Sequence, residues 1–93
     1  MGSSGSSMTQ RESDGVIFGR RLRELRTARG LTQQQLAAMI DSNHPFISNM
    51  ERGLTLPGLA MLIRLAGALD CRLVDLVKVL DQAGSRGTTG RKD

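Results

Sequence analysis

Polar side chains that can hydrogen-bond to a nucleic acid are concentrated between residues 43 and 52. The segment NHPFISNMER supplies two amides, an imidazole and a hydroxyl, from Asn43, His44, Ser48 and Asn49. Ile47 and Met50, three residues apart, give the same segment an apolar side. A short helix with one apolar and one polar face can present hydrogen-bonding groups to the base edges in the major groove of DNA. The segment therefore predicts a reader of double-stranded DNA, provided that another helix braces it.

The same residue types could instead support catalysis or metal binding. His44 and Cys71 are the only histidine and cysteine of the chain. A nucleophile–base pair needs them within hydrogen-bond reach of each other and of an orienting acid, yet they fall on separate predicted elements. Two residues also cannot supply the three or four ligands of a zinc site. We therefore predict that the chain is not an enzyme and uses no metal ion or cofactor, and we interpret Cys71 as a small, partly buried apolar residue.

Positive charge is concentrated in one stretch of the chain. The net charge is +4, and the stretch from 20 to 29 sets five arginines against the single acid Glu24: Arg20, Arg21, Arg23, Arg26 and Arg29. Such a stretch can attract a polyanion through counterion release, or it can simply keep an exposed helix soluble. Charge alone does not separate these two interpretations. With no Trp or Tyr and only two Phe, the chain lacks a stacking platform for single-stranded nucleic acid.

Helical periodicity and helix-end signals predict five helices and no strand. The first runs from 16 to 29 and is ended by Gly30, which enters the left-handed conformation without penalty. The second follows Thr32, which is expected to form a capping box with Gln35. The remaining helices are expected at 44–52, 59–69 and 73–80.

The third, fourth and fifth of these helices carry further signals. Asn43 is the expected N-cap of the third, and Pro45 lies in its first turn, where a missing N–H leaves no hydrogen bond unmade. The fourth is expected to bury one stripe, made of Leu59, Leu62, Ile63, Ala66 and Leu69. The fifth is apolar around nearly its whole circumference, which is more than one side of a small core requires.

The two ends of the chain are expected to lie outside the folded core. Residues 1–15 begin with MGSSGSS, typical of an expression leader, and continue into an N-terminus expected to be disordered. Residues 81–93 are expected to form a flexible polar basic tail, which leaves residues 16–80 as one domain. No apolar run approaches the ~20 residues of a membrane span. One cysteine and no signal segment suit a cytoplasmic protein.

A series of short motifs occurs in one register along this core: FGRRLR at 18–23, RGLTQ at 29–33, LA at 36–37, IS at 47–48, ERG at 51–53, Pro57, and LAGAL at 65–69. In this register the chain resembles the Cro-type, or xenobiotic-response-element, helix-turn-helix family of repressors. The resemblance covers residues 16–80 and implies an all-α, five-helix, lambda-repressor-like DNA-binding domain. In that fold the helix at 33–40 braces a recognition helix at 44–52.

The resemblance implies DNA-contacting roles on these two helices. Side chains expected to face the major groove are His44, Pro45, Ser48 and Asn49. Phosphate contacts are expected from Gln33, Asn43 and Arg52, with the dipole of the bracing helix assisting the first. Asn49 is the sharpest candidate, because its amide can bridge N6 and N7 of adenine; the alternative is a contact to phosphate only. Phe46 could touch a thymine methyl group or pack back against the domain.

Arg26 and Glu51 match a pair that forms a buried salt bridge in relatives, joining the first helix to the third. The recognition helix departs from the family pattern, since its first two turns hold no Lys, Arg or Gln and the usual guanine-reading side chain is absent. Base recognition is then expected to rest on Asn49, His44, apolar contacts and DNA shape.

The last helix predicts self-association through Val74, Val77 and Leu80, since relatives pair through their C-terminal helices. The resemblance therefore implies a homodimeric, sequence-specific transcriptional regulator, expected to be a repressor that binds an inverted-repeat operator. An antitoxin or protein–protein interaction module of the same fold, with a protein partner, is the alternative. A membrane-surface role is disfavoured, because the core requires the apolar face of the arginine-rich helix.

Overall fold

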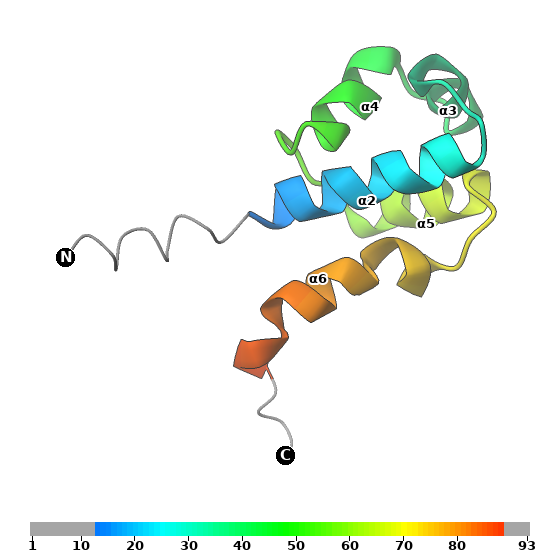
Figure 1. Ribbon diagram of the computed structural model, residues 1–93. Helices are drawn as coiled ribbons and strands as arrows, with labels where there is room; N and C mark the ends of the chain where they lie inside the picture. The colour runs from blue at the N-terminus through cyan, green and yellow to red at the C-terminus, as the bar shows by residue number, and fades with distance from the viewer. Residues whose placement is uncertain (1–12, 89–93) are drawn as a thin grey trace.

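The computed structural model describes residues 13–88, with side chains described for residues 13–80. Over this range the chain forms five α-helices and no strand: α2 (Asp14–Ala28), α3 (Gln33–Met39), α4 (His44–Glu51), α5 (Leu59–Ala68) and α6 (Leu73–Thr88). Helix α2 crosses the middle of the domain and contacts α4 on one side and α6 on the other, with α5 behind it in this view (Figure 1). The predicted all-α, five-helix architecture is confirmed.

The predicted caps fix where α3 and α4 begin. Thr32 and Gln35 form the reciprocal capping box: Oγ1 of Thr32 accepts from the Gln35 N–H at 3.0 Å, and the Thr32 N–H donates to Oε1 of Gln35 at 2.8 Å. Oδ1 of Asn43 accepts from the backbone N–H three residues ahead at 2.9 Å. Each cap satisfies N–H groups that the first turn of a helix leaves unpaired.

The connection between α3 and α4 is short because one residue adopts a left-handed backbone conformation. Asp41 has φ 58°, a conformation that Asp tolerates better than most side chains. The next N–H, of Ser42, returns to the carbonyl of Ala37 at 2.8 Å. This hydrogen bond closes the end of α3, so α4 starts within a few residues and in a fixed direction.

The core lies where α2 meets the other helices. Its fully buried side chains come from every helix: Phe18, Leu22, Leu36, Ile47, Met50, Leu65, Leu69 and Leu76. Helix α2 approaches the end of α4 so closely that a Cβ placed on Gly19 would lie 2.6 Å from the carbonyl oxygen of Glu51. Glycine at this position therefore permits the contact that holds α4 against α2.

The predicted buried stripe of α5 is partly wrong. Leu65, Ala66 and Leu69 are buried, whereas Leu59 and Ile63 are 65% and 56% exposed. The sequence of α5, LAMLIRLAGA, has Arg64 as its only polar side chain. Apolar and polar positions alternate too little along α5 for its periodicity to indicate the buried face. The packing of α5 against α6 determines which face is buried.

The chain ends also differ from expectation. Helix α2 begins at Asp14, capped by Ser13, so the domain starts before the expected boundary at residue 16. Helix α6 continues to Thr88, eight residues beyond the predicted end at Leu80, so part of the expected tail is helical. Gly84 and Gly87 each disfavour the helix by about 1 kcal/mol, but a glycine alone does not end a helix. The predicted leader up to residue 12 and the tail from residue 89 lie outside the described residues.

Candidate nucleic-acid interface

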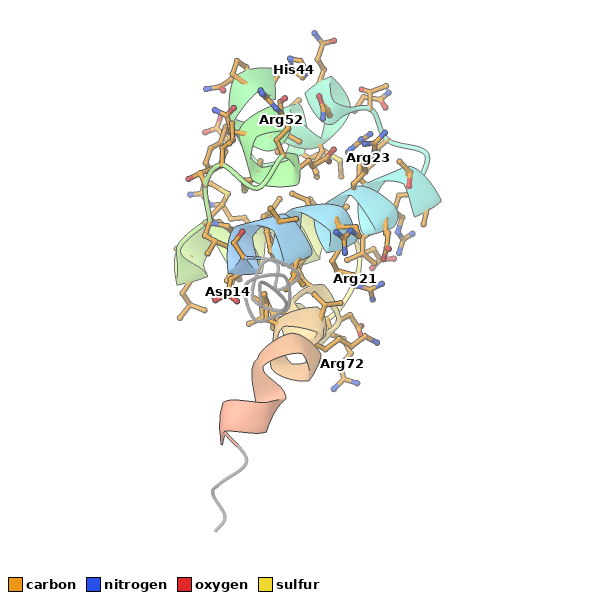
Figure 2. All side chains as sticks on the ribbon, turned by 60° about the vertical axis from the view of Figure 1, so that its left-hand side comes forward. Asp14, Arg21, Arg23, His44, Arg52 and Arg72 are labelled. Atoms are coloured by element: carbon orange, nitrogen blue, oxygen red, sulfur yellow. The ribbon has the colours of Figure 1, made fainter. Side chains whose placement is uncertain are left out.

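The outward face of α4 collects most of the residues expected to contact DNA. Ile47 and Met50 are fully buried, which turns the opposite side of the helix outward. At 100° per residue, that outward side carries Pro45, Ser48, Asn49 and Arg52. Pro45 and Arg52 are exposed, and Ser48 and Asn49 are half-buried. His44 and Arg52 lie at the same end of the molecule, the end formed by α3 and α4 (Figure 2).

The N-terminus of α4 is occupied by two residues with different constraints. Asn43 uses its carbonyl oxygen as the N-cap, so only its amide N–H groups remain for a phosphate. His44 is exposed and opens the helix. Phe46 is half-buried and packs against the core, which is the second of the two alternatives that the sequence left open.

Helix α4 is tied to α2 by the ion pair between Arg26 and Glu51. Nε of Arg26 lies 2.6 Å from Oε2 of Glu51, and Nη2 lies 3.0 Å from Oε1. Nη1 of Arg26 donates to the carbonyl of Leu31 at 2.8 Å, so the guanidinium also holds the turn before α3. The two side chains are 11% and 4% exposed. A bidentate, shielded pair of this kind fixes the relative position of three helices.

Gln33 connects this ion pair to the surface, a link that sequence patterns did not predict. Its Nε2 donates to Oε1 of Glu51 at 3.0 Å, and its Oε1 lies 2.6 Å from Nε2 of His44. The amide expected to contact a phosphate is therefore already used twice within the protein. One N–H of its NH₂ group remains for an external acceptor. No short-range signal could have revealed this link, because it joins residues 11 and 18 positions apart.

The arginine-rich stretch is mainly structural. Nε of Arg21 donates to the carbonyl of Asp75 in α6 at 2.9 Å. Arg29 donates to the carbonyl of Leu69 at 2.8 Å and forms an ion pair with Asp70. With Arg26 in its own ion pair, three of the five arginines hold α2 to its neighbours rather than forming one phosphate-facing patch. Arg21 points toward α6, away from the end that carries His44 (Figure 2).

The residues expected at a dimer interface differ in exposure. Val74 is 53% exposed, whereas Val77 and Leu80 are partly buried and pack against the core of their own chain. Packing within a single chain therefore accounts for part of the apolar character of α6. Other large apolar side chains with high exposure are Met39, Leu54, Leu56, Leu59 and Ile63.

Cys71 lies in the turn between α5 and α6 and packs partly buried against the core. Burial raises the pKa of its thiol, with a further contribution from the Asp75 carboxylate. Such a thiol is a poor nucleophile near neutral pH. In the part of the chain that the structure describes, no three potential metal-binding side chains come together. Among the helices of that part, none combines the length and the apolar character that crossing a bilayer requires.

A polar helix face braced by a second short helix and held by a buried ion pair defines a helix-turn-helix DNA-binding domain. The family model described as Helix-turn-helix matches residues 22–76, and the chain belongs to this family, the XRE-type helix-turn-helix proteins. The family resemblance inferred from the sequence motifs is thus confirmed. The family and the relatives below are transcription regulators rather than enzymes, as predicted.

Relatives agree on this assignment. The chain is 36% identical over 66 residues to the HTH-type transcriptional regulator DdrOP3 of Deinococcus deserti, a match covering 71% of this chain and 51% of that protein. The chain thus spans about half the length of this relative. The crystal structure of the restriction-modification controller protein C.AhdI from Aeromonas hydrophila superposes with a TM-score of 0.66 at 43% identity, covering 68% of this chain and 91% of that one. The clp gene regulator ClgR from C. glutamicum shares the fold, with a TM-score of 0.73 at 22% identity, over 78% and 94% of the two chains.

Proposed function

We propose that this chain regulates transcription by binding double-stranded DNA with sequence specificity through α4. The observation that carries the proposal is the outward face of α4, where hydrogen-bonding side chains occur on a helix clamped by the Arg26–Glu51 ion pair. A helix held in this way keeps the positions of its side chains when it enters the major groove. The names of the relatives, a transcriptional regulator and a controller protein, agree with this function.

The proposed contacts divide into base recognition and positioning. Asn49 is the proposed adenine reader, with His44, Ser48 and Pro45 contacting neighbouring base edges. Arg52 and the remaining N–H groups of Asn43 and Gln33 contact phosphates, which set the orientation of the helix without selecting a sequence. Because α4 offers no guanidinium to a guanine in its first two turns, we expect shape and methyl contacts to contribute to specificity.

We further propose that the chain acts as a homodimer on an inverted repeat. Two symmetry-related recognition helices can then read half-sites about 34 Å apart in successive major grooves. Val74 supports a contact between copies because it exposes an apolar side chain next to the partly buried Val77 on α6. Binding across a promoter would repress transcription by occlusion in the cytoplasm, where one unpaired cysteine is stable.

A second candidate function, a protein-binding module such as an antitoxin, is favoured by one observation. Six large apolar side chains on the described surface are between 49% and 65% exposed, among them Leu54, Leu59 and Ile63. Exposed apolar surface of this kind often marks a protein interface. The two functions are compatible, because the proposed base contacts lie on α4 whereas Leu59 and Ile63 lie on α5.

The proposal is tested by selecting bound duplexes from a random-sequence pool at 50 and at 200 mM salt, followed by sequencing. We expect an inverted repeat that remains enriched at the higher salt. Binding that disappears with salt and enriches no motif would mean that only phosphate contacts are made. The protein-binding function would then be the better explanation of this domain.

A further inference from the structure

Positive charge is distributed unevenly between the helix-turn-helix and the helix that holds it. The segment from 30 to 58, which contains both α3 and α4, has two acids, Asp41 and Glu51, and one arginine, Arg52, so its net charge is −1 with His44 neutral. A protein that binds duplex DNA neutralises several phosphates, and each contact adds affinity by releasing counterions. A helix-turn-helix with a single arginine therefore needs a further source of positive charge.

Helix α2, with the residue that follows it, carries five arginines against two acids. Three of them, Arg21, Arg26 and Arg29, donate to acceptors in other parts of the domain. The side chain of Arg23 differs from these three, because it is exposed and makes no hydrogen bond or ion pair with residues 13–80. All of its N–H donors therefore remain for an acceptor outside the chain.

Arg23 lies on the side of α2 that borders α4. Residues four apart share one side of a helix, and Gly19 is four residues before Arg23. A Cβ placed on Gly19 would lie 2.6 Å from the carbonyl oxygen of Glu51, at the end of α4. Arg26, three residues after Arg23, also reaches Glu51. Since Arg52 directly follows Glu51, the exposed guanidinium of Arg23 and that of Arg52 come from the two sides of one helix junction.

Figure 2 shows the same placement. Arg23 lies on the side of α2 nearer to His44 and Arg52, whereas Arg21 and Arg72 lie on the opposite side. An α-helix with its side chains is about 10–12 Å across and fills a major groove about 12 Å wide. A helix packed beside the one in the groove therefore meets the sugar–phosphate backbone rather than the bases.

We propose that Arg23 binds a phosphate of the strand that borders the groove occupied by α4, so that α2 supplies positive charge that the helix-turn-helix lacks. The proposal rests on the proposed function, because it requires α4 to lie in the major groove. The planar guanidinium can donate to two oxygens of one phosphate. Because every sequence presents the same phosphates, this contact raises the affinity for all duplexes alike. Base recognition then depends on α4, and part of the general affinity depends on α2.

The experiment measures how the affinity of Arg23→Gln for a random-sequence duplex changes between about 50 and 200 mM salt, by fluorescence anisotropy. Loss of one phosphate contact should reduce the slope of log K against log salt by about 0.9 for each protomer bound. The unchanged protein should therefore lose about 3.5-fold more affinity over this range than the variant, again for each protomer. Arg23→Lys should restore most of the slope, because an ammonium group also binds phosphate.

The matched control is Arg72→Gln. Arg72 is exposed like Arg23, and its replacement changes the net charge by the same amount, but it lies on the side of the molecule away from His44. We expect this variant to keep the slope of the unchanged protein. A general effect of net charge would alter both variants equally, and equal changes in slope would overturn the proposal. Arg23→Gln should also keep the urea midpoint of the unchanged protein, since the side chain has no partner to lose.

The outcomes separate the role of Arg23 from the function on which it rests. An unchanged slope in Arg23→Gln, with an operator still selected by the unchanged protein, would overturn the phosphate contact and leave sequence-specific binding intact. A different motif selected by Arg23→Gln would also overturn it, because a phosphate contact selects no base. Failure of the unchanged protein to bind any duplex at 50 mM salt would overturn the proposed function, and the role of Arg23 with it.

Discussion

The two halves of this domain differ in their side-chain interactions: polar side chains are hydrogen-bonded to one another in one half, and apolar side chains remain exposed to solvent in the other. In the half formed by α2, α3 and α4, the polar groups of Arg26, Glu51, Gln33 and His44 form one chain of hydrogen bonds from core to surface. In the half formed by α5 and α6, Leu59, Ile63 and Val74 leave more than half of their surface in water. The first half is thus distinguished by its connected polar groups, although Met39 is also 53% exposed there, and the second by several exposed apolar side chains.

This difference separates two requirements of a DNA reader. A recognition helix must hold its side chains in place before it meets DNA, because ordering them on binding would reduce affinity. A surface that joins two copies must instead expose apolar side chains in the monomer, which the partner then buries. The polar half is thus suited to recognition and the apolar half to association, and surface substitutions that leave the domain folded should affect one of these properties without the other.

The largest effect is expected when the polar half loses the centre of its network. Glu51→Ala removes the partner of the shielded Arg26 guanidinium and an acceptor of Gln33. Leaving a buried charge unpaired costs about 3–5 kcal/mol, a large part of the stability of a small domain. We therefore expect the variant to be largely unfolded in thermal and urea denaturation followed by circular dichroism.

The control for this prediction is an ion pair in solvent. Arg29 and Asp70 are 45% and 83% exposed, so Asp70→Asn, which removes the charge and tolerates the left-handed backbone at this position (φ 55°), should change stability by less than about 1 kcal/mol. Similar losses in the two variants would mean that shielding of the Arg26–Glu51 pair is not what makes it important.

The next effect concerns backbone packing in the two halves. Gly19→Ala would place a methyl group against the carbonyls of Met50 and Glu51, and the overpacking should cost about 1–3 kcal/mol. Gly67→Ala in α5 meets nothing within 4 Å and should stabilise the domain by up to about 1 kcal/mol through helix propensity. Urea denaturation midpoints measure the stability of both variants. If Gly67→Ala destabilises the domain, other atoms must lie closer to Gly67 than 4 Å.

A smaller effect, on binding rather than folding, distinguishes the proposed recognition residues. Asn49→Ala should weaken binding to the selected operator by about 1–3 kcal/mol and relax specificity at one base pair. Arg52→Ala should weaken binding to all sequences alike and reduce the slope of log K against log salt by about one. Fluorescence anisotropy over a salt series measures both quantities. Equal loss on specific and random duplexes for Asn49→Ala would reassign that side chain to a phosphate.

The sequence predicted the local features of this fold better than its contacts. Caps at Thr32 and Asn43 depend on residues three apart, so their patterns are visible in the chain. The buried face of α5 depends on α6, and the nearly uniform apolar sequence of α5 gave no way to choose it. The structural roles of Arg21 and Arg29 likewise depend on carbonyls more than 35 residues away.

The candidate site shows the same division between local and distant information. Family motifs indicated Arg26 and Glu51, because the pair occurs in a fixed register. The link from Gln33 to His44 could not be predicted, since it requires the crossing geometry of α3 and α4 and the polarity that Glu51 imposes on an amide.

Association through the apolar half should depend on α6. Val74→Glu places a charge on an exposed apolar position, so the monomer should fold normally while the dimer dissociation constant rises at least about tenfold, since burying one Val contributes about 1.5–3 kcal/mol. Sedimentation velocity over a concentration series measures the change. Ile63→Glu, at a position 56% exposed on α5, is the matched control. Dissociation by the α5 substitution alone would move the interface to α5.

The smallest effect is expected at Cys71, between the two helices of the apolar half. Burial raises the pKa of its thiol in the folded state, so the folded protein holds the thiol proton more tightly than the unfolded chain does. The resulting stability is present below the unfolded thiol pKa of about 8.5 and is lost as the pH rises through the folded value. Cys71→Ala should therefore lose less stability than the unchanged protein between about pH 8 and pH 10. Comparing urea midpoints of the two proteins across this range isolates the thiol from Lys78, which both contain. Parallel pH profiles would mean that the turn opens to water readily, and that the apolar half is looser around Cys71 than its packing against the core indicates.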